Sequence, residues 1–217
     1  MPLIELLPHK SWLSQQISVQ WIPADWVPPR VLDQLTVGTL ASAFVVLLWL
    51  GLVGGLSELA RRQGYGAEFT RKIVHIGAGQ VILLAWWLPV PPWMGIVAAV
   101  VAALVALLSY QLPILPGINS VGRRSLGTFF YATSIGVVMA WFWPQFPYYG
   151  VIGILIMSWG DGLAALIGQR WGRHPYQVLG QTKSWVGSLT MLIASFTVVA
   201  LVLCSVQGAI WQTWAVA

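Results

Sequence analysis

The sequence predicts an all-α integral membrane protein, a bundle of about six transmembrane helices with the N-terminus outside. Three observations support this class: 58% of the 217 residues are hydrophobic, only 8% are charged, and the apolar residues fall in long runs. Soluble domains carry roughly a quarter charged residues. Because so few charges cannot cover a water-facing surface, lipid must be the solvent for most of this chain.

Six apolar runs are long enough, or nearly so, to cross the bilayer as helices. A helix needs about 20 apolar residues to span roughly 30 Å of hydrocarbon. The runs are 37–59, 73–88, 92–110, 126–143, 148–167 and 185–206. The second is short, so we expect its helix to begin at Thr70 or Arg71. Residues 1–36 are expected to form an interfacial or disordered lead-in, and residues 37–217 a polytopic membrane domain whose site faces the cytoplasm.

The basic residues gather in the connections on one side of the predicted bundle. With six crossings, the first, third and fifth connections share a side. They hold nine of the 11 Lys and Arg residues: Arg61, Arg62, Arg71, Lys72, Arg123, Arg124, Arg170, Arg173 and Lys183. The positive-inside rule therefore places these connections in the cytoplasm and both termini outside. Since topology accounts for the net charge of +5, we expect no nucleic-acid partner.

Asp161 is an acidic residue inside the fifth apolar run, six residues or about 9 Å of helix from Ile167. A carboxylate at that depth costs several kcal/mol unless it is paired, hydrated or bound to a metal. One interpretation is a structural ion pair with a loop arginine. We favour a functional role, because intramembrane acids are usually functional and the flanking Gly160 and Gly162 allow a ligand to approach closely. Glu58 is expected to pair with Arg61 or Arg62 rather than share a metal with Asp161.

Arg71, Lys72 and His75 form a second cluster at the inner mouth of the second run. Residues three and four apart share a helix face, and two cations with an imidazole suit phosphate oxygens. The alternative is that the two cations only set topology and that His75 is a hydrogen-bonded histidine of the bundle.

Lys183 and Ser184 open the sixth run and superficially resemble a P-loop. Thr182 replaces the glycine that a P-loop needs before its lysine, and no strand is expected before the motif, so we reject that assignment. A Lys-Ser pair at a helix N-terminus is still a good anion site. Otherwise Lys183 only marks the membrane boundary. Arg124 belongs to a weaker basic group at the entrance of the fourth run.

Four segments, in this order, resemble the CTP-dependent polyprenol kinase family, specifically its phytol kinase branch. They are 71–77, 124–128, 160–168 and 183–188, and the resemblance covers roughly residues 58–188. It implies transfer of a phosphate from CTP to the hydroxyl of an isoprenoid alcohol, phytol or a similar prenyl alcohol, for tocopherol and phylloquinone synthesis. The implied location is the plasma or thylakoid membrane of a bacterium, for example a cyanobacterium, or a plastid membrane.

The resemblance also implies roles for the residues already singled out. Asp161 would be the catalytic residue, either as a ligand of Mg²⁺, the implied cofactor, or as acceptor of the alcohol proton; the sequence leaves both roles open. The nucleotide and its phosphates would contact Arg71, Lys72, His75, Arg124, Lys183, Ser184, Gly162 and Gly187. Glycines at these places allow either close helix packing or contact of the backbone with CTP.

Three other functions fit parts of the pattern. A cytidylyltransferase related to the CDP-diacylglycerol synthases would release pyrophosphate instead of CDP. A small transporter is disfavoured, since transporters place polar sites near the midplane of paired repeats. An inactive kinase-like scaffold is kept because the chain has no acid after Asp161, whereas members of the resembled family continue into a further helix with a late acidic motif. Chain-length preference, phosphate donor and oligomeric state are left open.

Overall fold

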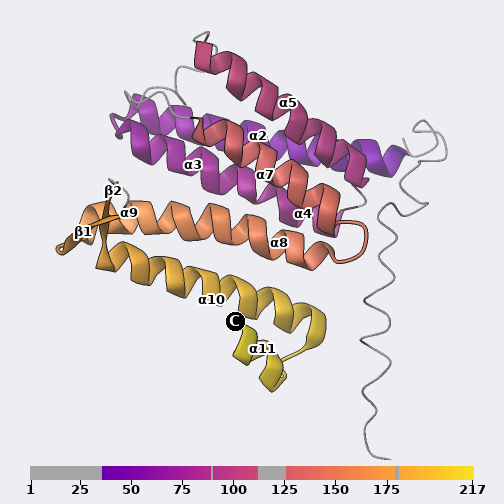
Figure 1. Cartoon of the computed structure of the whole chain (residues 1–217). Coiled ribbons are helices and arrows are strands. Elements are labelled where there is room, and N and C mark those ends of the chain that lie inside the picture. The colour runs from indigo at the N-terminus through magenta and orange to yellow at the C-terminus, as the bar shows by residue number, and fades with distance from the viewer. Residues whose placement is uncertain (1–35, 89, 112–125, 179–180) are drawn as a thin grey trace, which may run out of the picture. The chain divides into compact units, whose positions relative to one another are not determined.

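The computed structural model describes residues 36–88, 90–111, 126–178 and 181–217. Arg124, and all but the last residue of the predicted lead-in 1–36, lie outside these described residues. Residues Thr36–Ala217 form one unit, and it consists almost entirely of helices. Most of its long helical segments lie side by side (Figure 1).

The helices follow the apolar runs closely. Their bounds are α2 Val37–Arg62, α3 Ala67–Gly79, α4 Val81–Trp87, α5 Pro92–Gln111, α7 Gly127–Phe142, α8 Pro147–Leu155, α9 Asp161–Trp171, α10 Trp185–Gln207 and α11 Trp211–Val216. A π-helical turn, Ile156–Gly160, joins α8 to α9. Among the described residues, four continuous segments are long and apolar enough to cross a membrane: α2, α5, the run from α8 to α9, and α10. The all-α membrane class is confirmed; six crossings and an outside N-terminus stay predictions.

The second apolar run, 73–88, is divided rather than continuous. Its helix α3 starts earlier than expected, at Ala67, with Glu68 in the first turn where the helix dipole favours an acid. The helix is interrupted at Gln80, whose backbone N–H lies between the carbonyls of Ile76 and Gly77. The short α4 then continues the crossing.

A two-stranded antiparallel sheet lies in the fifth connection, where we expected no strand. Its strands are β1 Pro175–Val178 and β2 Gln181–Ser184, and Tyr176 is paired with Lys183. The expectation was wrong because aromatic and β-branched residues such as Tyr176 and Thr182 favour strands even in a short polar loop. Lys183 therefore lies on a strand, but in a hairpin and not in the strand–loop–helix of a P-loop.

The buried core of the described unit lies away from this hairpin. It is formed by apolar side chains of α4, α7, α8 and α10: Ile82, Met139, Val151, Ile154, Leu155, Val198 and Val202. The hairpin, the end of α9 and the start of α3 lie together at the opposite end (Figure 1). The polar candidates from three segments of the sequence are thus brought to one end of the bundle.

Candidate active site

Asp161, the first residue of α9, forms an ion pair with Lys72 of α3, 89 residues earlier in the chain. Lys72 Nζ lies 2.5 Å from Asp161 Oδ2, and His75 Nε2 lies 3.7 Å from the same oxygen. The Lys72 side chain is only 4% exposed, whereas that of Asp161 is 54% exposed. An ion pair was one of the two interpretations of Asp161, but its partner is a buried lysine and not a loop arginine.

The second oxygen of this carboxylate, Oδ1, is not the one that Lys72 and His75 contact. Lys72 and His75 both approach Oδ2, and Oδ1 accepts no hydrogen bond from any residue that the structure describes. The lysine neutralises the carboxylate without covering it. The site therefore offers one carboxylate oxygen next to a buried lysine, at the end of the bundle that carries the hairpin.

Arg71 does not join this cluster. Its guanidinium forms a two-pronged salt bridge with Glu68, at 2.6 and 2.9 Å, on the same helix. The predicted face of Arg71, Lys72 and His75 is thus divided, and only Lys72 and His75 point at Asp161. Glu68 was missed, although its i, i+3 spacing to an arginine is a recognisable pairing signal.

Glu58 behaves as expected. It accepts hydrogen bonds from Arg61 at 2.7 Å and from Arg62 at 2.8 Å, and does not take part in the Asp161 cluster. The two other acids among the described residues, Glu58 and Glu68, are therefore each paired on their own helix. Asp161 differs because its partner comes from another helix.

The glycines of the predicted nucleotide site lie at close helix contacts. A Cβ atom on Gly162 would come within 2.7 Å of the Ile76 side chain, and one on Gly187 within 3.0 Å of the Ala164 carbonyl and 3.5 Å of Gly168 Cα. Of the two roles that the sequence left open for these glycines, close packing is the one visible in the fold. Gly162 lets α3 approach α9, and this brings Lys72 to Asp161.

Ser184 is the N-cap of α10. Its Oγ accepts a hydrogen bond from the Gly187 N–H at 3.1 Å, and the Trp185 N–H is bonded to the His174 carbonyl at 3.4 Å. Two N–H groups of this terminus are therefore satisfied within the protein. Lys183 forms no salt bridge with a described residue, but its charge interacts with that of Asp161.

A network of polar contacts that the sequence analysis missed holds His75 beside Asp161. His75 Nε2 lies 3.1 Å from the carbonyl oxygen of Met157 in the π turn, and the Tyr131 hydroxyl donates to the His75 carbonyl at 2.9 Å. Tyr131 lies within an apolar run, where a buried tyrosine hydroxyl needs a partner. A tyrosine in an apolar run therefore predicts a hydrogen-bond partner for its hydroxyl, but the sequence could not say which helix supplies that partner.

A metal ion would depend on Asp161 alone. Within the described ranges, no three His, Cys, Asp or Glu side chains are close enough together to hold one. Mg²⁺ is often bound by only one or two carboxylates, with phosphate oxygens and water as the other ligands. The carboxylate of Asp161, whose side chain is 54% exposed, fits this pattern.

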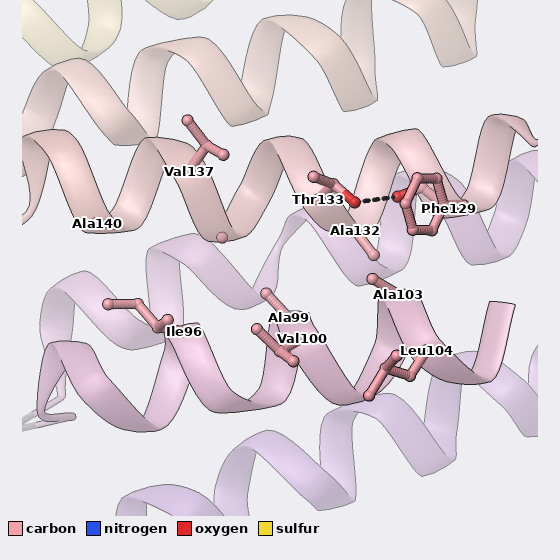
Figure 2. A pocket seen from close by; sticks show the side chains of 11 residues that line it. Ile96, Ala99, Val100, Ala103, Leu104, Phe129, Ala132, Thr133, Val137 and Ala140 are labelled. Atoms are coloured by element: carbon pink, nitrogen blue, oxygen red, sulfur yellow. Dashed lines mark hydrogen bonds between the residues drawn. The ribbon is translucent and has the colours of Figure 1, made fainter. Parts of the chain in front are cut away.

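An apolar pocket of about 430 Å³ lies between α5 and α7. Its lining is shown in Figure 2 and comprises Ile96, Ala99, Val100, Ala103, Leu104, Phe129, Ala132, Thr133, Gly136, Val137 and Ala140. The one hydroxyl among them, that of Thr133, is bonded to the Phe129 carbonyl of its own helix. The pocket therefore presents hydrocarbon surface in the part of the protein that lipid surrounds.

Comparison with known proteins points to one family. A phytol kinase of Synechocystis sp. is 59% identical over 162 residues, which cover 74% of this chain and 70% of that protein. Phytol kinase 1, chloroplastic, of Arabidopsis thaliana is 30% identical over 179 residues, 74% of this chain and 54% of the plant protein. A probable chloroplastic phytol kinase 1 of rice is 31% identical over 166 residues, 70% of this chain and 52% of its own length.

The chain thus spans about half the length of these two plant relatives and over two thirds of the cyanobacterial one. No protein-family model matches the sequence, and no solved structure matches it significantly. The identity to the cyanobacterial protein extends over most of both chains, and it agrees with the resemblance seen in the four segments of the sequence. This chain belongs to the phytol kinase family.

Proposed function

We propose that this protein is a membrane-bound prenyl alcohol kinase that transfers a phosphate from CTP to phytol or a similar alcohol at the cytoplasmic membrane face. The observation that carries the proposal is Asp161, half-exposed and ion-paired with buried Lys72, in a chain 59% identical to a phytol kinase. The membrane would be a bacterial plasma or thylakoid membrane or a plastid membrane. The product of the reaction would enter tocopherol synthesis there.

Phosphoryl transfer asks a protein mainly for positioning and for neutralisation of charge. The hydroxyl oxygen of the alcohol attacks the terminal phosphorus of CTP, the bond to the bridging oxygen breaks, CDP leaves, and the hydroxyl proton is released. Lys72 keeps Asp161 ionised, so that Oδ1 can accept this proton or hold Mg²⁺, which would supply charge neutralisation at the phosphates. Lys183 and Arg124 are the proposed triphosphate contacts; Arg71 would join them only by leaving Glu68.

The assay for this proposal uses purified protein in lipid nanodiscs with phytol and each of CTP, ATP, GTP and UTP. We expect phytyl phosphate and CDP, with CTP as the preferred donor. Release of pyrophosphate instead of CDP would identify a cytidylyltransferase and overturn the proposal. Absence of any nucleotide turnover would identify a scaffold.

The hydrocarbon tail of the alcohol needs an apolar place between helices, and the pocket between α5 and α7 offers one. Val100 lines this pocket, whereas Val97, one turn away on the same helix, does not; both are 52% exposed. We expect Val100→Phe to raise the KM for phytol more than the KM for a short prenyl alcohol. Val97→Phe should leave both values unchanged. Equal effects of the two variants would remove the pocket from the proposal.

A further inference from the structure

The support for Asp161 begins in the π turn directly before it. In an α-helix the Asp161 N–H would bond to the carbonyl four residues back, on Met157. Here it bonds to the Ser158 carbonyl. Single π turns inside α-helices are frequent at functional sites. This one changes the backbone bonding at the Met157 carbonyl, one helical turn before the catalytic candidate.

His75 of α3 contacts that carbonyl. Its Nε2 lies 3.1 Å from the Met157 oxygen, and because a carbonyl only accepts, Nε2 must carry the proton. The same N–H edge lies 3.7 Å from Asp161 Oδ2. His75 thus fills the space between the π turn and the carboxylate and limits the directions in which the carboxylate can turn.

Tyr131 of α7 holds His75 in this place. Its ring packs on the imidazole with 4.2 Å between centroids, and its hydroxyl donates to the His75 carbonyl at 2.9 Å. Gly79 makes the approach possible, since a Cβ atom there would come within 2.8 Å of the Tyr131 hydroxyl oxygen. One side chain of α7 therefore fixes both the backbone and the ring of His75.

We propose that Tyr131 is a positioning residue: it fixes the His75 ring against the Met157 carbonyl and thereby sets the direction of the Asp161 carboxylate. Tyr131 reaches no reacting group itself. It acts through His75, and the effect on the reaction rests on the proposed kinase function. The assignment also gives His75 a role other than phosphate binding, because its Nε2–H already donates a hydrogen bond to the Met157 carbonyl.

The kinetic test compares Tyr131→Phe with Tyr131→Leu, using CTP and phytol. The Phe variant keeps the ring and loses one neutral hydrogen bond, so kcat should fall about 2- to 12-fold. The Leu variant also loses the ring contact and should lower kcat further, with little change in either KM. Tyr149→Phe is the matched control, since it removes a tyrosine hydroxyl at the start of α8, 12 residues or about 18 Å of helix from Asp161.

A second readout does not depend on activity. The chain has three histidines, and replacing His9 and His174 by Gln leaves His75 as the only one. Nitrogen-15 spectra of the His75 ring in nanodiscs should show the Nε2–H tautomer, and Tyr131→Leu should mix the two tautomers. If Tyr131→Leu retains wild-type kcat or wild-type ring signals, Tyr131 does not position His75. If the unmodified protein phosphorylates no alcohol, the kinase function fails, and the spectra still decide the role of Tyr131.

Discussion

At the scale of single residues, the site is governed by one buried cation and one half-exposed anion. Lys72 is 4% exposed, and Asp161 provides its only salt bridge among the described residues. Removing one member of a buried pair leaves an uncompensated charge, which typically costs about 3–5 kcal/mol, whereas replacing both members can be nearly neutral. Stability and catalysis can therefore be separated at this pair.

Asp161→Asn is expected to lower the rate of phosphate transfer by about 10²-fold or more, because a metal ligand or a general base is lost. The same variant should unfold at a lower temperature, because the buried Lys72 ammonium loses its counter-charge. The double variant Lys72→Met, Asp161→Asn should regain the unfolding temperature but not the activity. Fluorescence-monitored unfolding and phytyl phosphate formation measure the two effects, and recovery of activity in the double variant would reduce Asp161 to a structural residue.

Lys183→Ala tests whether this exposed cation binds the nucleotide. Loss of a charge-assisted contact is worth about 1.5–3 kcal/mol, so the KM for CTP should rise roughly 10- to 150-fold. Arg170 is the control in the same connection; its guanidinium lies 5.2 Å from the ring centroid of Trp171, and Arg170→Ala should change the KM for CTP little. Equal small effects would make Lys183 a boundary marker and move the search to Arg124.

At the scale of helices, glycines decide how closely α9 meets its neighbours. A Cβ atom on Gly168 would come within 2.9 Å of Ser184 Oγ and 3.2 Å of Gly187 Cα, and the latter is backbone that cannot rotate away. Gly153 on α8 is different, since a Cβ atom there meets no heavy atom within 4 Å. The two positions form a matched pair within one membrane segment.

Gly168→Ala should therefore separate α9 from α10 and lower stability by about 1–3 kcal/mol, the usual cost of overpacking. Gly153→Ala should be neutral or stabilising, because alanine is favoured over glycine in a helix by roughly 1 kcal/mol. Unfolding temperatures of the two variants in the same detergent test this. A Gly168→Ala variant as stable as the Gly153→Ala variant would mean that α9 and α10 do not pack this closely.

At the scale of the whole molecule, the one-sided charge distribution predicts the topology. Gln63 and Arg173 lie in the first and fifth connections, and Gln145 lies in the fourth; all three are exposed. In a Cys204→Ala background, single cysteines at Gln63 and Arg173 should react with an impermeant maleimide only after the membrane is opened. A cysteine at Gln145 should react in intact cells. Labelling of Gln63 and Arg173 from outside would invert the topology and place the site on the wrong face for CTP.

The sequence by itself determined the class of protein and the positions of nearly all its membrane helices. Long apolar runs with few charges leave no other solvent than lipid, and backbone hydrogen bonds in lipid must be satisfied within helices. It also identified Asp161, because an acid in an apolar run is conspicuous, and it paired Glu58 with its neighbouring arginines, because that contact is local along one helix.

Only the tertiary structure decided which residues meet. The partner of Asp161 is 89 residues away, and its identity depends on how closely α3 approaches α9 at Gly162. The role of Tyr131 depends likewise on its reach from α7 to the His75 carbonyl on α3, and His75 in turn lies 3.1 Å from the Met157 carbonyl of the π turn. Periodicity and spacing describe one helix at a time, whereas contacts between helices depend on side-chain shapes on both of them.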